Sequence, residues 1–257
     1  MGMGSGAVTK QRRLHREVMA EFAGQIVGGH LVPGEALPNE VALAERFGIS
    51  RGVVRESLRA LDERGLVTVR HGTTTLVNAR EHWDLFDPDV IAASLAGSGA
   101  ESLLSEYLEC RRIVEIEAAG LAAERATRAQ LVTLSEALER MAAAAAQPAA
   151  GPSAEDRFHE ADIAFHRAVI HATGNHALGR MTEPVHRALA AARRPLARPD
   201  LRLERSLPEH RRILAAIADG DADEARGAMR DHLLTVERYL SEYAAEAAPD
   251  GEARPRA

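Results

Sequence analysis

The chain has 257 residues, which exceeds the usual size of one domain and fits two. Apolar residues make up 46% of it and aromatic residues 4%, a balance that favours helices over sheets. The single cysteine, Cys110, excludes a disulfide framework and a cysteine-based zinc cluster. No apolar run approaches the roughly 20 residues that span a bilayer, and Met1 to Ala7 lacks the apolar segment of a signal peptide. We therefore expect a cytoplasmic protein with no membrane partner.

Charge is unevenly distributed along the chain, whose net charge is −6. The segment from Lys10 to Arg80 holds 11 Lys or Arg and 8 Asp or Glu, a net of +3, so the remainder carries −9. A basic N-terminal region followed by an acidic C-terminal region is typical of a nucleic-acid-binding module joined to a different domain.

The first part of the chain predicts three helices and a two-stranded hairpin. The helices follow from apolar residues at helical spacing, from Asn39 and Ser50 as N-caps, and from Gly28 as a stop. The strands follow from β-branched residues on both sides of a turn at His71-Gly72. The helices are expected over Leu14–Val27, Val41–Phe47 and Ser50–Arg64, and the strands over Leu66–Arg70 and Thr73–Val77.

This order of elements is that of a winged helix-turn-helix. The third helix presents Arg51, Arg55 and Arg59 four residues apart on its polar face. The free backbone N–H groups of its first turn suit a DNA phosphate. An ordinary solvated face would hold such arginines too, but the short preceding helix and the hairpin favour DNA binding.

Residues 31–78 resemble the DNA-binding domain of the GntR family of bacterial repressors. The resemblance is carried by Pro38-Asn39-Glu40, by Leu43-Ala44-Glu45-Arg46-Phe47-Gly48-Ile49-Ser50-Arg51, by Val54-Arg55-Glu56-Ser57-Leu58, and by Leu61 to Gly65. It implies that arginines of the third helix enter the major groove, that Arg46 helps to position the DNA backbone, and that the hairpin tip enters the minor groove. The implied DNA-contacting residues are Arg46, Ser50, Arg51, Arg55, His71 and Gly72.

Two positions depart from the family pattern. The family often has an arginine directly after the Pro-x-Glu segment, where this chain has Val41, so one DNA contact is expected to be missing. The family hairpin usually has a second glycine, where this chain has Thr73-Thr74-Thr75. The conformation of the wing is therefore less firmly predicted than that of the helices.

The remainder of the chain predicts helices and little else. Residues 79–100 are expected to form a linker and a short helix, in which Trp83 packs the linker against one of the domains. Residues 101–245 predict an antiparallel all-helical bundle whose first helix, from Glu101 to Ala126, buries an apolar stripe that includes Ile113. Residues 10–78 form the DNA-binding domain in this prediction, and residues 1–9 and 246–257 are expected to be disordered.

Four polar side chains of the bundle have the spacing of a metal site. Asp162 and His166 are four residues apart and share one helix face. His210 lies 10 residues before the turn at Gly220 and His232 lies 12 after it, so an antiparallel hairpin brings them to one level. Three imidazoles and a carboxylate suit Zn²⁺, with Ni²⁺ or Mn²⁺ as alternatives. Satisfied core histidines are the competing interpretation.

Residues 101–242 resemble the FCD ligand-binding domain of the FadR-type subgroup of this family. The matching stretches are Asp162-Ile163-Ala164-Phe165-His166, Thr173-Gly174-Asn175, Glu209-His210-Arg211-Arg212-Ile213, Ala216-Ile217 and Met229-Arg230-Asp231-His232. The resemblance implies that Asp162, His166, His210 and His232 hold a divalent metal beneath a ligand cavity. It also places Arg111 at that cavity as a carboxylate clamp, and the alternative is a salt bridge from Arg111 to Glu115 on the same helix. Asn175 either touches the ligand or caps its helix.

Together these features predict a transcription regulator rather than an enzyme: a homodimer, by default a repressor, that binds a double-stranded operator. The effector is expected to be a small carboxylate, and the segment from Trp83 to Asp89, which resembles members tied to sugar-acid catabolism, favours an aldonate or related hexonate. Lactate, a dicarboxylate or an acyl thioester are alternatives, although the last needs no metal. Two further alternatives are a regulator that senses the metal itself and a metalloenzyme, which lacks an evident general base beside the metal motif.

Overall fold

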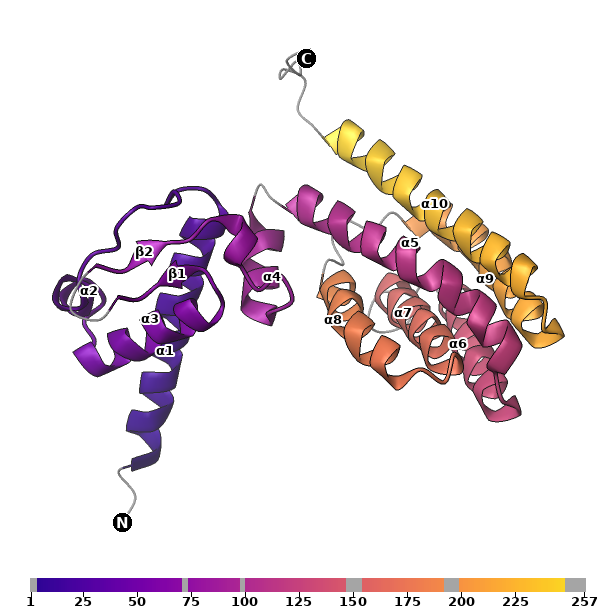
Figure 1. Ribbon diagram of the computed structural model, residues 1–257, viewed down its shortest axis with the longest axis horizontal. Coiled ribbons are helices and arrows are strands. Elements are labelled where there is room, and N and C mark those ends of the chain that lie inside the picture. Colours follow the sequence, from indigo (N-terminus) through magenta and orange to yellow (C-terminus); the bar gives the residue numbers. More distant parts are fainter. Residues whose placement is uncertain (1–3, 71–73, 98–99, 147–153, 192–198, 248–257) are drawn as a thin grey trace. The chain divides into compact units, whose positions relative to one another are not determined.

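The structure, a computed structural model, describes residues 4–70, 74–97, 100–146, 154–191 and 199–247 (Figure 1). The chain divides into two compact units, Met1–Leu103 and Leu104–Ala257. Each unit has a hydrophobic core of its own. None of the helices in the described part of the chain is long and apolar enough to cross a bilayer.

The first unit is the expected winged helix-turn-helix. Helix α1 packs against α3 and α4, and α2 packs against α3. The two short strands pair antiparallel, with Val67 opposite Val77 and Thr68 opposite Leu76. The elements are α1 (Gly4–Val27), α2 (Glu40–Phe47), α3 (Arg51–Glu63), β1 (Val67–Thr68), β2 (Leu76–Val77), the 3-10 helix η1 (Arg80–His82) and α4 (Pro88–Ala96).

The observed ends of α2 and α3 agree with the predicted ranges to within one residue. The side chain of Asn39 accepts hydrogen bonds from the backbone N–H groups of Val41 and Ala42, so α2 begins as predicted. Gly48 ends α2 with φ 63°, a left-handed conformation that favours glycine. Ser50 then caps α3 by accepting from the N–H of Val53.

Helix α1 begins at Gly4, ten residues before the predicted start at Leu14. Residues 4–9, which were expected to be disordered, are therefore helical, whereas residues 1–3 lie outside the described part. Val18, Phe22 and Ile26 anchor the C-terminal half of α1 in the core. Once that half is helical, each earlier residue adds a backbone hydrogen bond without a new nucleation cost.

The linker belongs to the first unit. Trp83 packs against its core, as predicted, and donates from Nε1 to the carbonyl oxygen of Asn78 at 3.2 Å. Helix α4 is the expected short helix of the linker and is capped by Asp87. The guanidinium of Arg64, at the end of α3, bonds to Asp87 at 3.0 Å and to Asp89 at 2.7 Å. These two bonds join the end of α3 to the beginning of α4.

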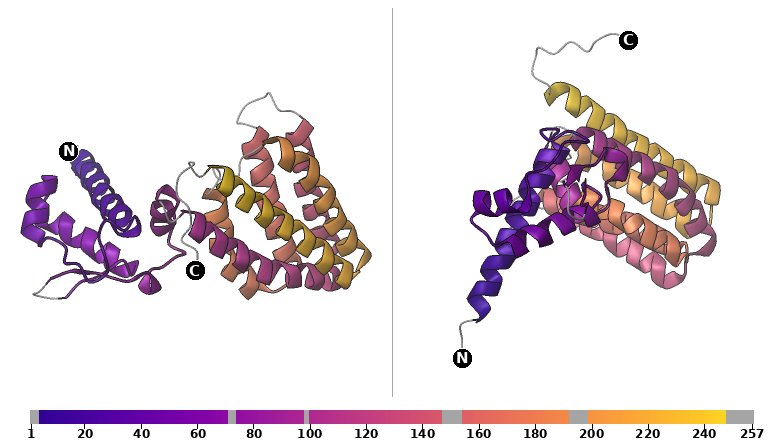
Figure 2. Two further views of the ribbon diagram at one scale, coloured as in Figure 1. Left: turned by 90° about the horizontal axis from the view of Figure 1, so that it is seen from above. Right: turned by 60° about the vertical axis from the view of Figure 1, so that its left-hand side comes forward.

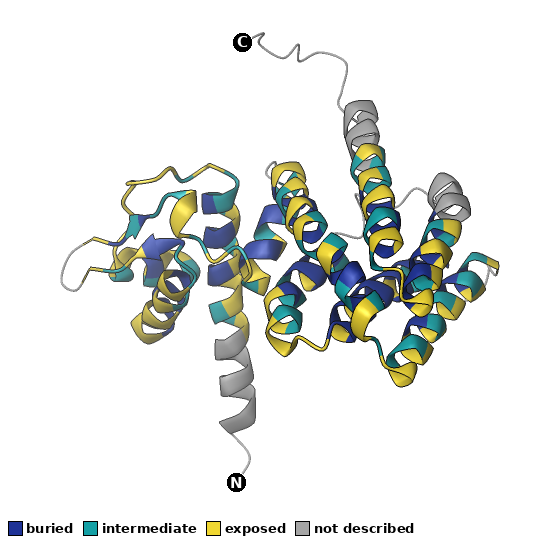
Figure 3. Ribbon diagram, turned by 45° about the vertical axis from the view of Figure 1, so that its right-hand side comes forward, coloured by how far each residue is buried: buried dark blue, intermediate teal, exposed yellow. Residues whose placement is uncertain are grey.

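The second unit is the expected all-helical bundle (Figure 2). Helix α6 packs against α7 and α9, α7 against α8, and α9 against α10. Buried residues, dark blue in Figure 3, line the inner faces of the helices. The helices are α5 (Ala100–Arg125), α6 (Arg128–Ala146), α7 (Ala154–Ala172), α8 (His176–Ala191), α9 (Pro199–Asp219) and α10 (Ala222–Ala247).

Helix α5 departs from its predicted apolar stripe at one turn. Ile113 was expected inside, yet 64% of it is exposed. Arg111 and Glu115 are buried in its place, at 6% and 1% exposure. Residues two apart on a helix point to nearly opposite faces, so burial of Arg111 turns Ile113 to solvent. A charged pair buried in a core requires a polar environment around it.

Candidate metal centre and nucleic-acid interface

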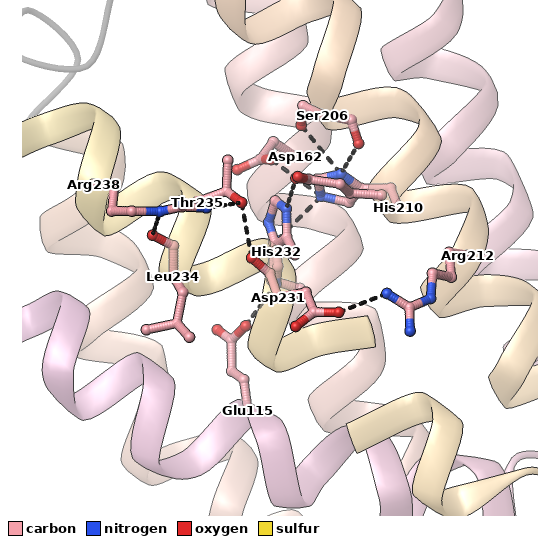
Figure 4. Close-up of polar contacts among 12 residues, drawn as sticks. Glu115, Asp162, Ser206, His210, Arg212, Asp231, His232, Leu234, Thr235 and Arg238 are labelled. Atoms are coloured by element: carbon pink, nitrogen blue, oxygen red, sulfur yellow. Dashed lines mark hydrogen bonds and ion pairs between the residues drawn. The ribbon is translucent and has the colours of Figure 1, made fainter. Parts of the chain in front are cut away.

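Four polar side chains from three helices converge in the core of the second unit. Asp162 and His166 come from α7, His210 from α9 and His232 from α10. Each offers one ligand atom, and these atoms lie within 4.8 Å of one another. None of the four is more than 2% exposed. Asp162, His210 and His232 point toward one another in Figure 4. The structure thus brings together all four residues of the predicted metal set.

The spacing of the ligand atoms fits a small divalent cation. The Nε2 atom of His166 lies 3.2 Å from Nε2 of His210 and 3.2 Å from Nε2 of His232. Nε2 of His210 also lies 3.2 Å from Oδ1 of Asp162. Two nitrogen atoms bound to one zinc ion at ~2.1 Å in a tetrahedral arrangement are about 3.4 Å apart. The observed separations are close to this value.

Outer partners fix the orientation of all three imidazole rings. Each ring directs Nδ1 at a carboxylate or carbonyl oxygen, which can only accept, so Nδ1 donates and Nε2 faces the centre. The accepting atoms are Glu115 Oε2 for His166 (2.6 Å), the Ser206 carbonyl oxygen for His210 (2.7 Å) and Glu209 Oε2 for His232 (2.8 Å).

The electrostatics of the site favour metal ligation. Burial, and next the positive charge of Arg111, lowers the pKa of His166 to about 3. Burial, and next the neighbouring His210, holds the pKa of His232 well below its usual value. Both rings are therefore neutral near pH 7, and their Nε2 lone pairs face each other with no proton between them. A cation bound to both atoms would remove this repulsion, so the residues present fit a bound divalent metal.

Glu115 connects the cluster to a buried arginine. Its carboxylate accepts from Nε of Arg111 at 3.0 Å and lies 2.9 Å from Nε2 of His186, besides its bond to His166. Burial alone would raise the pKa of Glu115, but the Arg111 guanidinium and His166 hold it well below its usual range. The Nη2 atom of Arg111 is buried without a hydrogen-bond partner. Arg111 thus makes the predicted salt bridge and retains an unused donor.

The sequence did not identify Glu115 as a partner of the metal ligands or His186 as part of this network. His186 comes from α8, 71 residues from Glu115, and no local spacing relates the two. The four-residue interval between Arg111 and Glu115 was the one available signal.

Replacing Glu115 with glutamine is expected to weaken metal binding about 10- to 100-fold, because a neutral amide orients and polarises His166 less well. Competition against a chelator of known affinity measures the change. Glu117→Gln is the matched control, since Glu117 lies on the same helix and pairs with Arg226 at the surface. Equal metal affinity in the two variants would contradict the role of Glu115.

Asn175 lies at the surface, at the beginning of α8. Its side-chain oxygen accepts from the backbone N–H groups of Ala177 at 3.1 Å and Leu178 at 3.2 Å. The capping interpretation is therefore confirmed. Contact with an effector stays a prediction for this residue.

The arginines expected at DNA lie on α2 and on the exposed face of α3. Arg55 bonds to Glu40 through two atoms, Arg59 bonds to Glu56 at 3.0 Å, and Arg46 pairs with Glu21 of α1. Within the described ranges, no carboxylate lies within 4.0 Å of the Arg51 guanidinium. His71 and Gly72 lie outside the described residues, so the wing contacts stay predictions. Val41 is 48% exposed and supplies no charge.

Comparison with known proteins accounts for both units. The family described as bacterial regulatory proteins, gntR family, matches residues 14–77, and the FCD domain matches residues 106–235. The HTH-type transcriptional regulator LutR of Bacillus subtilis is 34% identical over 85% of this chain and 97% of its own length. The chain belongs to the GntR family. Its FCD domain places it with the FadR-type regulators, as the motifs predicted.

Two further comparisons agree with this assignment. The galactonate operon transcriptional repressor of Escherichia coli is 32% identical over 85% of this chain and 93% of its own length. The solved structure of Lar, described as controlling expression of the Listeria monocytogenes agr system, covers 91% of this chain and 97% of its own with a TM-score of 0.61. At 18% identity, Lar supports the fold alone. The relatives are DNA-binding transcription regulators, as expected for this chain.

Proposed function

We propose that this GntR-family regulator is a homodimeric repressor whose operator affinity is controlled by a small carboxylate, of the sugar-acid class, bound at a divalent metal in the FCD domain. Asp162, His166, His210 and His232 would hold the metal, with Zn²⁺ the preferred ion and Ni²⁺ or Mn²⁺ as alternatives. When bound, the cation supplies positive charge and coordination positions to an oxygen-rich anion.

The observation that carries this proposal is the facing pair of neutral imidazoles. Nε2 of His166 and Nε2 of His232 are 3.2 Å apart, and both Nδ1 atoms are engaged by carboxylates. In a core that serves packing alone, two converging lone pairs cost free energy, whereas a cation bound to both would be stabilised by them. This feature favours a metal site over a set of satisfied core histidines.

Arg111 supports a carboxylate effector. Its Nη2 atom is buried without a hydrogen-bond partner, and unpaired buried donors are costly. A guanidinium bound to Glu115 through Nε retains the end that pairs with a second carboxylate through two N–H groups. An effector carboxylate would satisfy this donor beside the metal ligands. The name of the galactonate repressor, one of the relatives, agrees with a sugar acid as that effector.

Control of DNA binding follows from linkage. A homodimer would place two α3 helices in successive major grooves of a near-palindromic operator. An effector that binds the free protein more tightly than the operator complex weakens operator binding by the same factor.

The first experiment is metal analysis of the purified protein together with thermal melting in the presence of galactonate, gluconate, lactate and succinate. We expect about one metal ion per chain and a rise in the melting temperature with a hexonate. A rise with lactate or succinate alone would replace the sugar acid by another effector. No metal and no shift with any acid would contradict the proposal. Operator binding that requires the metal but no acid would make the metal itself the signal.

Replacing Arg111 with lysine is expected to weaken effector binding at least tenfold while metal content stays unchanged. Lysine preserves the positive charge beside Glu115 but loses the planar fork that pairs with a carboxylate. Isothermal titration of the acid that shifts the melting temperature measures the change. Arg112→Lys is the control, because Arg112 pairs with Glu237 and is partly exposed. Equal affinity in the Arg111→Lys protein and the wild type would remove Arg111 from the effector site.

A further inference from the structure

The guanidinium of Arg55 is held by a carboxylate from a different helix. Nε of Arg55 lies 3.2 Å from Oε1 of Glu40, and Nη2 lies 2.9 Å from Oε2. Glu40 is the first residue of α2, where Asn39 caps the helix. The backbone position of Glu40 is therefore fixed by the fold and does not depend on Arg55.

Two bonds of this kind leave one edge of the guanidinium available. The group has five N–H donors in a rigid plane, and Glu40 takes the one on Nε and one of the two on Nη2. The remaining donors are both N–H groups of Nη1 and the second of Nη2. One N–H of Nη1 and this N–H of Nη2 point the same way and form an end-on fork. Guanine presents O6 and N7 in the major groove, and a forked arginine is the commonest group that reads them.

The other two arginines on this face of α3 differ from Arg55. Arg59 makes one bond, to Glu56 on its own helix, and both side chains are at least 60% exposed. Arg51 has no carboxylate within 4.0 Å among the described residues. Among the three arginines on this exposed face of α3, Arg55 is thus the one that a second helix holds through two bonds.

The pair contributes little to stability. The side chains of Arg55 and Glu40 are 56% and 36% exposed, and water and salt screen an ion pair at such a position. The hydrogen bond from Arg55 nevertheless lowers the pKa of Glu40, so the carboxylate is ionised whenever the protein is near neutral pH. A long arginine side chain loses rotamer freedom when it binds, and a partner that orders it beforehand reduces this loss.

We propose that Glu40 is a positioning residue that holds Arg55 with its end-on fork directed at a guanine of the operator half-site. Glu40 then determines base specificity without touching a base. The inference rests on the placement of α3 in the major groove, which is the docking mode of helix-turn-helix proteins. It is independent of the metal and of the effector.

Glu40 should affect specific and non-specific binding in opposite directions. Removing its negative charge near the DNA strengthens binding to every sequence. Removing its two hydrogen bonds to Arg55 weakens the recognition of one base. A merely structural role for Glu40 would lower both affinities together, so the ratio of the two affinities separates the alternatives.

The experiment selects binding sites for the full-length protein from a random duplex pool, with wild type, Glu40→Ala, Arg55→Ala and Glu56→Ala. We expect the wild type to select a guanine at one position of each half-site, and Glu40→Ala and Arg55→Ala to lose that preference at the same position. Glu56→Ala is the matched control, because it removes a carboxylate from a neighbouring arginine and should leave the preference intact. Glu40→Gln, which retains one acceptor, should be intermediate.

Affinities for the selected operator and for an unrelated duplex, measured at one salt concentration, complete the test. Glu40→Ala should lower the ratio of specific to non-specific affinity about tenfold, and should have no further effect in an Arg55→Ala background. Thermal melting establishes that the variants are folded. An unchanged guanine preference in Glu40→Ala would overturn the proposal. So would an Arg55→Ala protein that loses affinity equally for every sequence, because Arg55 would then contact a phosphate.

Discussion

Replacement of His210 by alanine is expected to abolish the metal binding that we propose for the FCD domain. The change deletes one of four ligand side chains and leaves Asp162 and two imidazoles without the atom that lies 3.2 Å from Asp162 and 3.2 Å from His166. The metal content of the purified protein, measured by mass spectrometry, should fall from about one ion per chain to a small fraction of that. The melting temperature should fall by about 10 °C, because metal binding contributes several kcal/mol to folding.

His159→Ala is the matched control for this experiment. His159 is also a buried histidine of α7, at 7% exposure, and it bonds through Nε2 to the carbonyl oxygen of Leu189 at 3.2 Å. Its loss creates a comparable cavity without removing a ligand, so metal content should remain near that of the wild type. A His210→Ala protein that retains a full complement of metal would show that the four residues do not form the site.

Replacement of Arg51 by alanine should lower operator affinity about 100-fold. Arg51 begins α3, and its charge is not committed to any carboxylate within 4.0 Å in the part of the chain that the structure describes. It is therefore available to DNA without breaking an ion pair, and a forked contact with a base is worth about 1–3 kcal/mol beyond the charge itself. Fluorescence anisotropy with a labelled operator measures the effect.

Arg59→Ala removes the same charge from the same helix face. Arg59 pairs with Glu56, so its loss should reduce affinity only a few-fold and to a similar degree for operator and unrelated DNA. If the two substitutions had equal effects on the operator, α3 would contribute charge alone, and its placement in the major groove would be wrong.

The elements that could be predicted are those with local causes. Asn39 and Ser50 set the beginnings of α2 and α3 through their own side chains, and the structure confirms both N-caps. The metal set was accessible for a similar reason. Asp162 and His166 share a helix face, and a tight turn at Gly220, with φ 74°, brings the two histidines of the α9–α10 hairpin to one level.

What could not be predicted depends on packing between distant helices. Glu115 meets His166 across 51 residues and His186 across 71, and neither distance has a periodic signature. The same holds for Glu40 and Arg55, which are 15 residues apart on two helices. The position of Ile113 was predicted wrongly because an apolar residue on a long helix was assumed to face inward. The charged residues Arg111 and Glu115 occupy the buried face of α5 instead.

The contact between α3 and α4 determines how a displacement elsewhere in the chain would reach α3. Arg64, which ends α3, is 22% exposed in its side chain and is held by Asp87 and Asp89, which begin α4. Helix α4 also packs along α1. Ion pairs and helix packing therefore connect the linker to the winged helix, and we expect a displacement of the chain after Ala96 to move the two together. Such a movement would rotate α1 to α4 as one body. A small rotation near Ala96 would then become a larger displacement of the exposed side chains of α3.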